Sequence, residues 1–159
     1  MEGRLTTRVA VFVIVRNDKG EMLLQRRSPG LYLGDHWDFP SGHGEFNESI
    51  RESAVRELKE EVDLTGRAED LRLVHVDQYF VEVNYINFVF ELDTWSGTPK
   101  ICEPDKCSAI GWFAEGLLPE KCVNVVRATE AAGFGNELTY SVTDKTTCYD
   151  LLGLPKQAI

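Results

Sequence analysis

The segment from Ile50 to Val62 constrains the fold most strongly, because its pattern predicts a helix with two different faces. An apolar residue recurs at every fourth position, namely Ile50, Ala54, Leu58 and Val62. That spacing places the four side chains in one stripe along a helix. Such a stripe must pack against another layer of structure, so the chain has to supply a sheet or a second helix beside it.

The predicted helix has two candidate starts and one expected end. Asn47 can cap it, and Glu48 then lies in the first turn, where negative charge suits the helix dipole. Ser49 and Glu52 have the spacing of a capping box and give an alternative start. Thr65 and Gly66 are expected to end the helix.

The second face of this helix carries three carboxylates. Glu57, Glu60 and Glu61 stand at positions i, i+3 and i+4 and project together. Two carboxylates about 4 Å apart near a protein surface repel by roughly 4 kcal/mol, and a bound cation would remove that repulsion. Oxygen ligands suit hard cations such as Mg²⁺, Mn²⁺ or Ca²⁺. For the glutamates alone, a solvated face with Arg56 and Lys59 as ion-pair partners is the alternative.

Apolar, β-branched runs predict the strands that this helix needs. The runs are residues 9–15, 21–25, 71–83, 85–92 and 107–113. Residues 28–44 are rich in Gly, Pro and aromatic residues without a period, which predicts a long functional loop. A second helix is expected over 118–132, and the residues from 137 onward have no clear pattern. This order of elements favours an α/β fold with a mixed sheet flanked by helices.

The length and charge of the chain limit its domain organisation and the classes of partner it can bind. The chain has 159 residues, which predicts one domain. Its formal charge of −9 argues against polymeric nucleic acid or an anionic membrane surface as partner. No apolar run is long enough to span a membrane and the start lacks a signal-peptide core, so a cytoplasmic protein is expected. The cysteines have no zinc-ligand spacing and are expected to be free thiols: Cys102, Cys107, Cys122 and Cys148.

The spacing of residues around the glutamates is the most specific signal. Gly42 is followed by five residues and Glu48, and seven more lead to the run from Arg56 to Leu64. This pattern resembles the Nudix box, G-x5-E-x7-R-E-U-x-E-E-x-G-U, where U is a bulky aliphatic residue. Asp63 stands where the family has Gly. The departure affects the turn after the helix, because Asp tolerates left-handed backbone geometry less well than Gly.

The resemblance extends beyond the box, over about residues 8 to 132. Residues 37–43 look like the aromatic-x-x-Pro-Gly-Gly segment that precedes the box, with Ser41 for the first Gly. Residues 95–99, followed by Glu103, resemble the segment of MutT-type members that supplies a further carboxylate from a loop. The resemblance implies an α/β/α sandwich with a loop–helix–loop metal site. It also implies a single Nudix domain over residues 1–159 with the box at 42–64.

The resemblance implies hydrolysis of a nucleoside diphosphate linked to another group, with Mg²⁺ or Mn²⁺ as cofactor. The family's metal ligands carry over to Glu57, Glu60, Glu61, Glu103 and the Gly42 carbonyl. Arg56 is expected to orient Glu57 through a bidentate pair, and Glu48 to support the site through Arg56 or a bound water. The general base stays open between Glu103 and the last two glutamates of the helix.

Several side chains outside the carboxylate set are candidates for substrate binding. They are Arg26, Arg27, Tyr32, Trp37, His43 and Tyr79. Either arginine can meet a phosphate or form a surface ion pair. Tyr32 and Trp37 can stack on a base, and Trp37 can equally belong to the core. His43 is a candidate phosphate neighbour, and Tyr79 lies on a strand that can line the cleft.

The leading interpretation is a Mg²⁺-dependent Nudix pyrophosphohydrolase that acts on a small nucleoside diphosphate derivative. A MutT-like pyrophosphatase for (oxidised) nucleoside triphosphates competes with an enzyme for ADP-ribose, nucleotide sugars or dinucleotides. Two other classes are a Nudix domain that binds a nucleotide without turning it over and an acid-rich structural domain. The complete set of box carboxylates argues against both. Dimers are frequent in the family, so the resemblance allows a homodimer.

Overall fold

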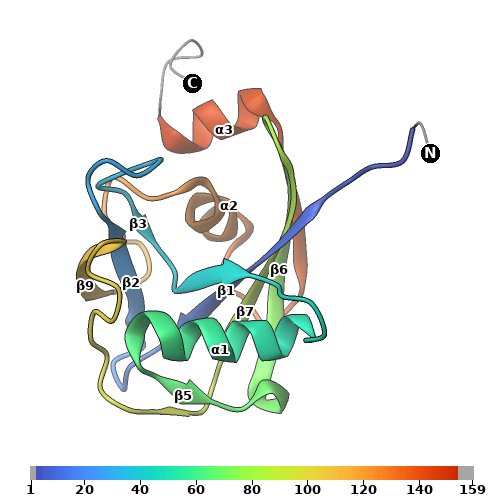
Figure 1. Ribbon diagram of the computed structural model, residues 1–159. Coiled ribbons are helices and arrows are strands. Elements are labelled where there is room, and N and C mark those ends of the chain that lie inside the picture. Colours follow the sequence, from blue (N-terminus) through green and yellow to red (C-terminus); the bar gives the residue numbers. More distant parts are fainter. Residues whose placement is uncertain (1–2, 154–159) are drawn as a thin grey trace.

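The computed structural model of the chain describes residues 3–153 (Figure 1). The strands are β1 (Arg8–Val15), β2 (Met22–Arg27), β3 (Trp37–Asp38), β4 (Ser41–His43), β5 (Thr65–Gly66), β6 (Leu71–Phe80), β7 (Asn84–Leu92), β8 (Trp95–Ser96), β9 (Cys107–Phe113) and β10 (Thr139–Thr143). The helices are α1 (Ile50–Val62), α2 (Asn124–Ala132) and α3 (Lys145–Leu152), and a short 3₁₀ turn spans Ala68–Asp70. No helix in this described range is long and apolar enough to cross a membrane.

The main sheet has five strands in the order β10-β6-β7-β1-β4. Strand β1 lies beside β7 in parallel and beside β4 in antiparallel orientation. Strand β6 pairs with β7 antiparallel, and β10 joins the free edge of β6 in parallel. The expected mixed sheet is therefore confirmed. A second sheet of three strands has the order β3-β2-β9, and β5 pairs with β8.

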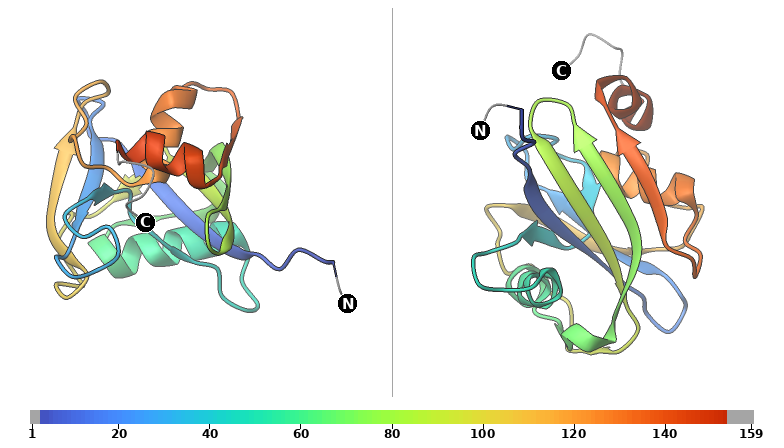
Figure 2. Two further views of the ribbon diagram at one scale, coloured as in Figure 1. Left: turned by 90° about the horizontal axis from the view of Figure 1, so that it is seen from above. Right: turned by 90° about the vertical axis from the view of Figure 1, so that its right-hand side faces the viewer.

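Strand β1 separates two hydrophobic cores because its side chains alternate between the faces of the sheet. Val11 and Val13 face the core that contains the α1 stripe, whereas Ile14 faces the core that contains Val125 and Val126 of α2. Figure 2 shows α1 on one side of the five-stranded sheet and α2 with α3 on the other. The expected α/β/α sandwich is confirmed, and the apolar run of β1 is buried from both sides.

Helix α1 begins and ends through identifiable capping groups. Ser49, rather than Asn47, is the N-cap: its Oγ accepts the Glu52 N–H, and the Glu52 carboxylate accepts the Ser49 N–H at 2.7 Å. The helix ends at Val62, earlier than expected, and Asp63 follows in the left-handed conformation with φ 59°. Residues 65–66 do not end the helix but pair with β8.

The second helix is shorter than the sequence predicts. It begins at Asn124 instead of residue 118. The segment before it is held beside β3, since Trp37 donates its N–H to the Lys121 carbonyl at 2.8 Å and accepts from the Val123 N–H at 2.9 Å. A helix would need these same backbone groups for its own hydrogen bonds.

Three other predictions differ from the structure in detail. The expected loop over 28–44 contains β3 and β4, which are too short to produce a periodic pattern. The strand expected over 71–83 ends at Phe80, because residues 81–83 form the turn of a hairpin with β7. The residues from 137 onward contain β10 and α3. The four cysteines are free thiols, as predicted.

Candidate active site

Gly42 brings strand β4 against helix α1. It lies opposite Val11 in the antiparallel pairing of β4 with β1, at the edge of the main sheet. A Cβ at position 42 would lie 1.9 Å from Cδ of Glu57. Only glycine therefore leaves room for this glutamate beside the β4 backbone. This close approach joins the loop and helix parts of the box into one site.

Arg56 gathers the carboxylates of the box. It donates to both oxygens of Glu48, at 2.7 and 3.1 Å, and to Glu57 at 2.9 Å and Glu60 at 3.2 Å. It also donates to the backbone carbonyl of His43 at 2.9 Å. The bidentate pair is thus with Glu48, whereas the sequence predicted it with Glu57. Arg56 offsets the repulsion between these carboxylates and holds them next to β4.

The bond to Arg56 also sets the charge of Glu48. Together with a 2.6 Å hydrogen bond from the Ser53 hydroxyl, it lowers the pKa of Glu48 to about 2. Glu48 is therefore ionised throughout the neutral range. Its fixed charge anchors Arg56, and Arg56 in turn positions the ligand candidates Glu57 and Glu60.

Glu61 points away from Arg56, toward the second sheet. Its Oε2 accepts hydrogen bonds from the Gln25 side chain at 2.5 Å and from the Ser41 N–H at 2.8 Å. Burial raises the pKa of this carboxyl to about 8, although both hydrogen bonds favour its ionised form. A positive charge bound nearby would favour ionisation further.

Glu103 lies across a small cavity from the helix. The cavity has a volume of about 80 Å³ and is lined in part by Gln25, Arg26, Arg27, Ser41, Glu61, Glu103 and Lys106. The Glu103 carboxylate accepts from the Lys106 ammonium at 2.8 Å. The structure therefore brings Glu103 to the same cavity as Glu61. It also places three cationic side chains there.

The donor set fits a hard divalent cation in its chemistry. It consists of carboxylate and backbone oxygens, which Mg²⁺ and Mn²⁺ prefer, and the gap left by Gly42 admits Glu57 to the β4 backbone. Within residues 3–153, however, no group of three or more His, Cys, Asp or Glu side chains is arranged as a metal site. The carboxylates instead bond to Arg56, Gln25 and Lys106, and binding a cation requires some of them to change partners.

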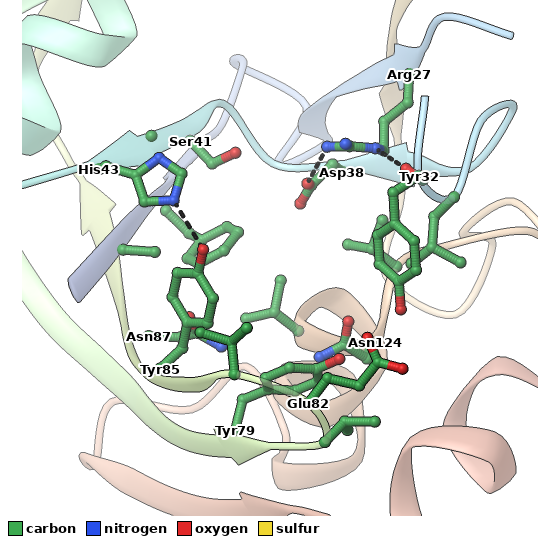
Figure 3. A pocket seen from close by; sticks show the side chains of 18 residues that line it. Arg27, Tyr32, Asp38, Ser41, His43, Tyr79, Glu82, Tyr85, Asn87 and Asn124 are labelled. Atoms are coloured by element: carbon green, nitrogen blue, oxygen red, sulfur yellow. Dashed lines mark hydrogen bonds and ion pairs between the residues drawn. The ribbon is translucent and has the colours of Figure 1, made fainter. Parts of the chain in front are cut away.

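A larger cavity of about 360 Å³ lies beside the carboxylate site (Figure 3). Its polar lining includes Arg27, Tyr32, Asp38, His43, Tyr79 and Asn124. Ser41 and Arg27 line both cavities, so the two are neighbours. The lining of the larger cavity is otherwise mainly apolar and aromatic, which is typical of sites for flat organic ligands.

Five of the six predicted substrate-binding residues line one of these cavities. Arg27 donates to the Tyr32 carbonyl at 2.9 Å, and His43 lies 3.2 Å from the Tyr85 hydroxyl. Arg26 lines only the smaller cavity and pairs with Asp35 at 2.6 Å. Trp37 lines neither cavity and packs edge-on against Phe113, with the ring centroids 4.9 Å apart.

Three polar residues of the site were missed from the sequence: Gln25, Asp38 and Asn124. Asp38 is 4% exposed and its Oδ1 has no hydrogen-bond partner. Burial raises the pKa of its carboxyl to about 7. The sequence contained a signal for two of these residues. Asp38 stands between Trp37 and Phe39, and Gln25 directly follows three apolar residues of β2. A polar side chain inside an apolar segment calls for a partner.

Comparison with known proteins shows a family to which most of the chain is similar. The family profile of the NUDIX domain matches residues 6–128. Over 87 residues the chain is 31% identical to the 8-oxo-dGTP diphosphatase of Escherichia coli (strain K12), a match that covers 54% of this chain and 66% of that protein. Over 54 residues it is 46% identical to the RNA pyrophosphohydrolase of Halorhodospira halophila, covering 34% of this chain and 28% of that protein. The chain thus spans less than two thirds of these curated relatives.

Solved structures agree on the fold. The crystal structure of a MutT NUDIX hydrolase from Burkholderia pseudomallei matches with a TM-score of 0.72 at 25% identity, covering 80% of this chain and 98% of that one. Strand β10 and helix α3 lie beyond the residues that the family profile matches.

Proposed function

Because the chain belongs to the NUDIX family, we propose that it hydrolyses the diphosphate linkage of a nucleoside diphosphate derivative with the help of Mg²⁺ or Mn²⁺. The observation that carries this proposal is the position of Gly42. Its missing side chain lets Glu57 reach β4, so that the box carboxylates meet beside a cavity of nucleoside size. A merely solvated acidic face would not need this close approach.

The cation would be held by Glu57, Glu60, Glu61, Glu103 and the carbonyl of Gly42. When bound there, it supplies positive charge that offsets the negative charge of the phosphates and favours attack by water on phosphorus. The chain itself contributes the arrangement: Glu48 fixes Arg56, and Arg56 fixes Glu57 and Glu60. Such supporting bonds keep ligands in place between turnovers.

The proton of the attacking water needs an acceptor near the phosphates. Glu103 is one candidate, because it lines the smaller cavity and is partly exposed. Glu60 and Glu61 are the others. Lys106 donates to Glu103 at 2.8 Å and would hold this carboxylate beside the smaller cavity.

The phosphates would lie at the smaller cavity and the nucleoside in the larger one. Arg26, Arg27 and Lys106 line the smaller cavity and supply positive charge for phosphate oxygens. Arg27 lines both cavities, so it would stand where the sugar joins the phosphates. Tyr32 and Tyr79 would offer ring surface to the base.

For the substrate we favour a nucleoside triphosphate, including oxidised forms, over ADP-ribose or a dinucleotide. The similarity to a protein named 8-oxo-dGTP diphosphatase, which extends over 87 residues, supports this choice. A larger leaving group would need space beyond a cavity of about 80 Å³.

A substrate screen tests the proposal. The purified protein is incubated with nucleoside triphosphates, 8-oxo-dGTP, nucleotide sugars, ADP-ribose and dinucleotides in Mg²⁺, and released phosphate or pyrophosphate is measured. We expect turnover of one or more triphosphates. A protein that binds these nucleotides but turns over none of the panel would contradict the proposal and favour a binding domain.

A further inference from the structure

Strand β10 is an open edge of the main sheet. It pairs with β6 on one side and has no neighbouring strand on the other, and Figure 2 shows it as the outermost strand. Within residues 3–153, its outward backbone N–H and C=O groups bond to no other backbone segment. Such an unpaired row can pair with a further strand. The opposite edge differs, because β4 has three residues and its Gly42 lies against α1.

The edge lacks the features that protect edge strands from pairing. Natural edge strands usually carry charged side chains, proline or a bulge. Residues 138–143 contain no charged residue and no proline, and the pairing of β10 with β6 is regular. The whole chain has a formal charge of −9, which opposes the approach of two copies. The uncharged edge therefore offers a surface on which this repulsion is low.

An exposed apolar row lies along this edge. Leu138, Tyr140 and Val142 alternate with polar residues, so they share one face of the sheet. Leu138 is 59% exposed and Tyr140 is 61% exposed, and Phe80 of β6 adds a further exposed ring to the same face. Helix α1 packs against β1 and β4, at the other end of the sheet. Exposed apolar side chains that gather beside an open edge mark an interaction surface.

The sequence of β10 is complementary to itself in antiparallel orientation. When two copies pair about a two-fold axis at Ser141, Tyr140 lies opposite Val142 of the partner subunit. Thr139 then lies opposite Thr143 of the partner subunit. Aromatic side chains opposite β-branched ones, and threonine opposite threonine, stabilise antiparallel strands. The two-fold axis forms each of these contacts twice.

The residues that flank β10 are complementary in charge. Glu137 precedes the strand and Lys145 follows it, and both are exposed. In the antiparallel arrangement each Glu137 lies at the end where Lys145 of the partner subunit lies. Asp144 also lies there, but its carboxylate caps α3 by accepting the N–H and the hydroxyl of Thr147. The flanks therefore favour a second copy of this chain over an unrelated strand.

We propose that two copies of this chain associate through antiparallel pairing of their β10 strands, centred on Ser141, which joins their main sheets into one continuous sheet. The inference does not depend on the proposed function, because β10 lies beyond the residues that the family profile matches. The paired segments are short, so the interface is small and the dimer dissociates on dilution.

Sedimentation equilibrium of the native full chain tests association itself. Samples cover concentrations from about 1 µM to about 1 mM. We expect the average mass to rise from that of one chain toward that of two as the concentration increases. A native protein that stays monomeric over the whole range would overturn the inference.

A charge placed on the edge tests whether β10 is the interface. Val142→Lys puts an ammonium group opposite Tyr140 of the partner subunit, so we expect the dissociation constant to rise at least about tenfold. The matched control Leu117→Lys alters a side chain that is 75% exposed between β9 and α2, and should keep the native dissociation constant. Circular dichroism checks that both variants fold. A folded Val142→Lys variant that dimerises like the native protein would exclude β10 as the interface.

Reversal of the flanking charges tests the antiparallel register with exposed residues alone. Glu137→Lys and Lys145→Glu each place like charges opposite one another, so each should raise the dissociation constant about threefold or more at low salt. The double variant restores opposite charges and should return to the native value. Two single variants without effect, or a double variant weaker than both, would contradict the proposed pairing even if the native protein is a dimer.

Discussion

Negative charge is stabilised differently in the Arg56 cluster, which consists of Arg56 with Glu48, Glu57 and Glu60, and at the buried carboxyl of Asp38. Around Arg56, three carboxylates share one guanidinium, and both oxygens of Glu48 accept a hydrogen bond from it. Asp38 is more deeply buried but has an oxygen without any partner. The carboxylates of the first group have hydrogen-bond partners within the protein. The Oδ1 of Asp38 has none among residues 3–153.

This difference teaches which carboxylates the fold stabilises and which one it does not. Changes in the Arg56 cluster should lower stability or reaction rate for every substrate. A change at Asp38 should raise stability at alkaline pH. The following predictions begin with the largest expected effect.

Loss of a carboxylate that we propose as a metal ligand should have the largest effect on rate. Glu60→Gln removes a charge on the exposed side of α1 that in our proposal binds the cation, so we expect turnover to fall by orders of magnitude with the fold intact. Initial rates at saturating Mg²⁺ and circular dichroism check both parts. The control Glu69→Gln alters an exposed acid outside the box and should keep the native rate. Near-native turnover of Glu60→Gln would show that the site is assigned wrongly.

A methyl group at position 42 should disrupt the close contact between strand β4 and helix α1. Gly42→Ala places Cβ 1.9 Å from Glu57 Cδ, so the glutamate must move, and we expect a stability loss of about 1–3 kcal/mol together with loss of activity. Urea unfolding and initial rates measure the two effects.

Gly44→Ala is the matched control for this change. A Cβ there meets its nearest neighbour, Ser53 Oγ, at an ordinary 3.7 Å, so stability and rate should stay near native. Equal behaviour of the two alanine variants would contradict a requirement for close approach at Gly42.

Replacement of the shared guanidinium should have a moderate effect on stability. Arg56→Lys keeps the charge but cannot bond Glu48 bidentately while also reaching Glu57 and Glu60. We expect a loss of about 1–2 kcal/mol in the free energy of unfolding. The control Arg67→Lys concerns an exposed ion pair and should change stability by less than about 0.5 kcal/mol. A loss of unfolding free energy no greater than that of the control would contradict the role of Arg56 in positioning these carboxylates.

Asp38→Asn should instead stabilise the protein at alkaline pH. Burial raises the pKa of Asp38 from 3.8 to about 7, so the folded state binds this proton more tightly than the unfolded state. The stability from Asp38 is therefore complete below about pH 4 and is lost as the pH rises through 7. Because asparagine does not ionise, the Tm of the variant should exceed the native Tm by several degrees at pH 8.

The pH dependence of the difference in Tm between the variant and the native protein serves as the internal control of this experiment. Arg27 and Glu61, the charged neighbours of Asp38, are present in both proteins. The difference in Tm should therefore shrink as the pH falls from 8 toward 4. A variant that is less stable than the native protein at pH 8 would show that Asp38 serves the fold.

The sequence predicted the side of the site that contains the box better than the side that contains Asp38 and Asn124. The stripe of α1 and the spacing from Gly42 to Leu64 repeat at fixed intervals, so periodicity and spacing reveal them. Asp63, at the box position where the family has Gly, does adopt the left-handed conformation. Ion pairs with Lys59 and, at 2.8 Å, with Lys100 hold it there.

The side with Asp38 and Asn124 depends on contacts between segments far apart in sequence. Asp38 and Asn124 border one cavity because residues 121–123 pair with Trp37 through backbone hydrogen bonds. No local pattern encodes that pairing, and the same pairing delayed the start of α2. The late strand β10 was missed for a similar reason, since its polar residues are hydrogen-bonded to His75 and Asp77 of β6.

Removal and return of the cation test the central claim most directly. Hydrolysis of a nucleoside triphosphate by the native protein is followed by ³¹P NMR, first in Mg²⁺, then with excess EDTA, then after Mg²⁺ or Mn²⁺ is restored. Because in our proposal a cation bound by the box carboxylates offsets the charge of the phosphates, we predict turnover, complete loss and recovery in that order. Hydrolysis that continues in excess EDTA would contradict the role assigned to the box carboxylates.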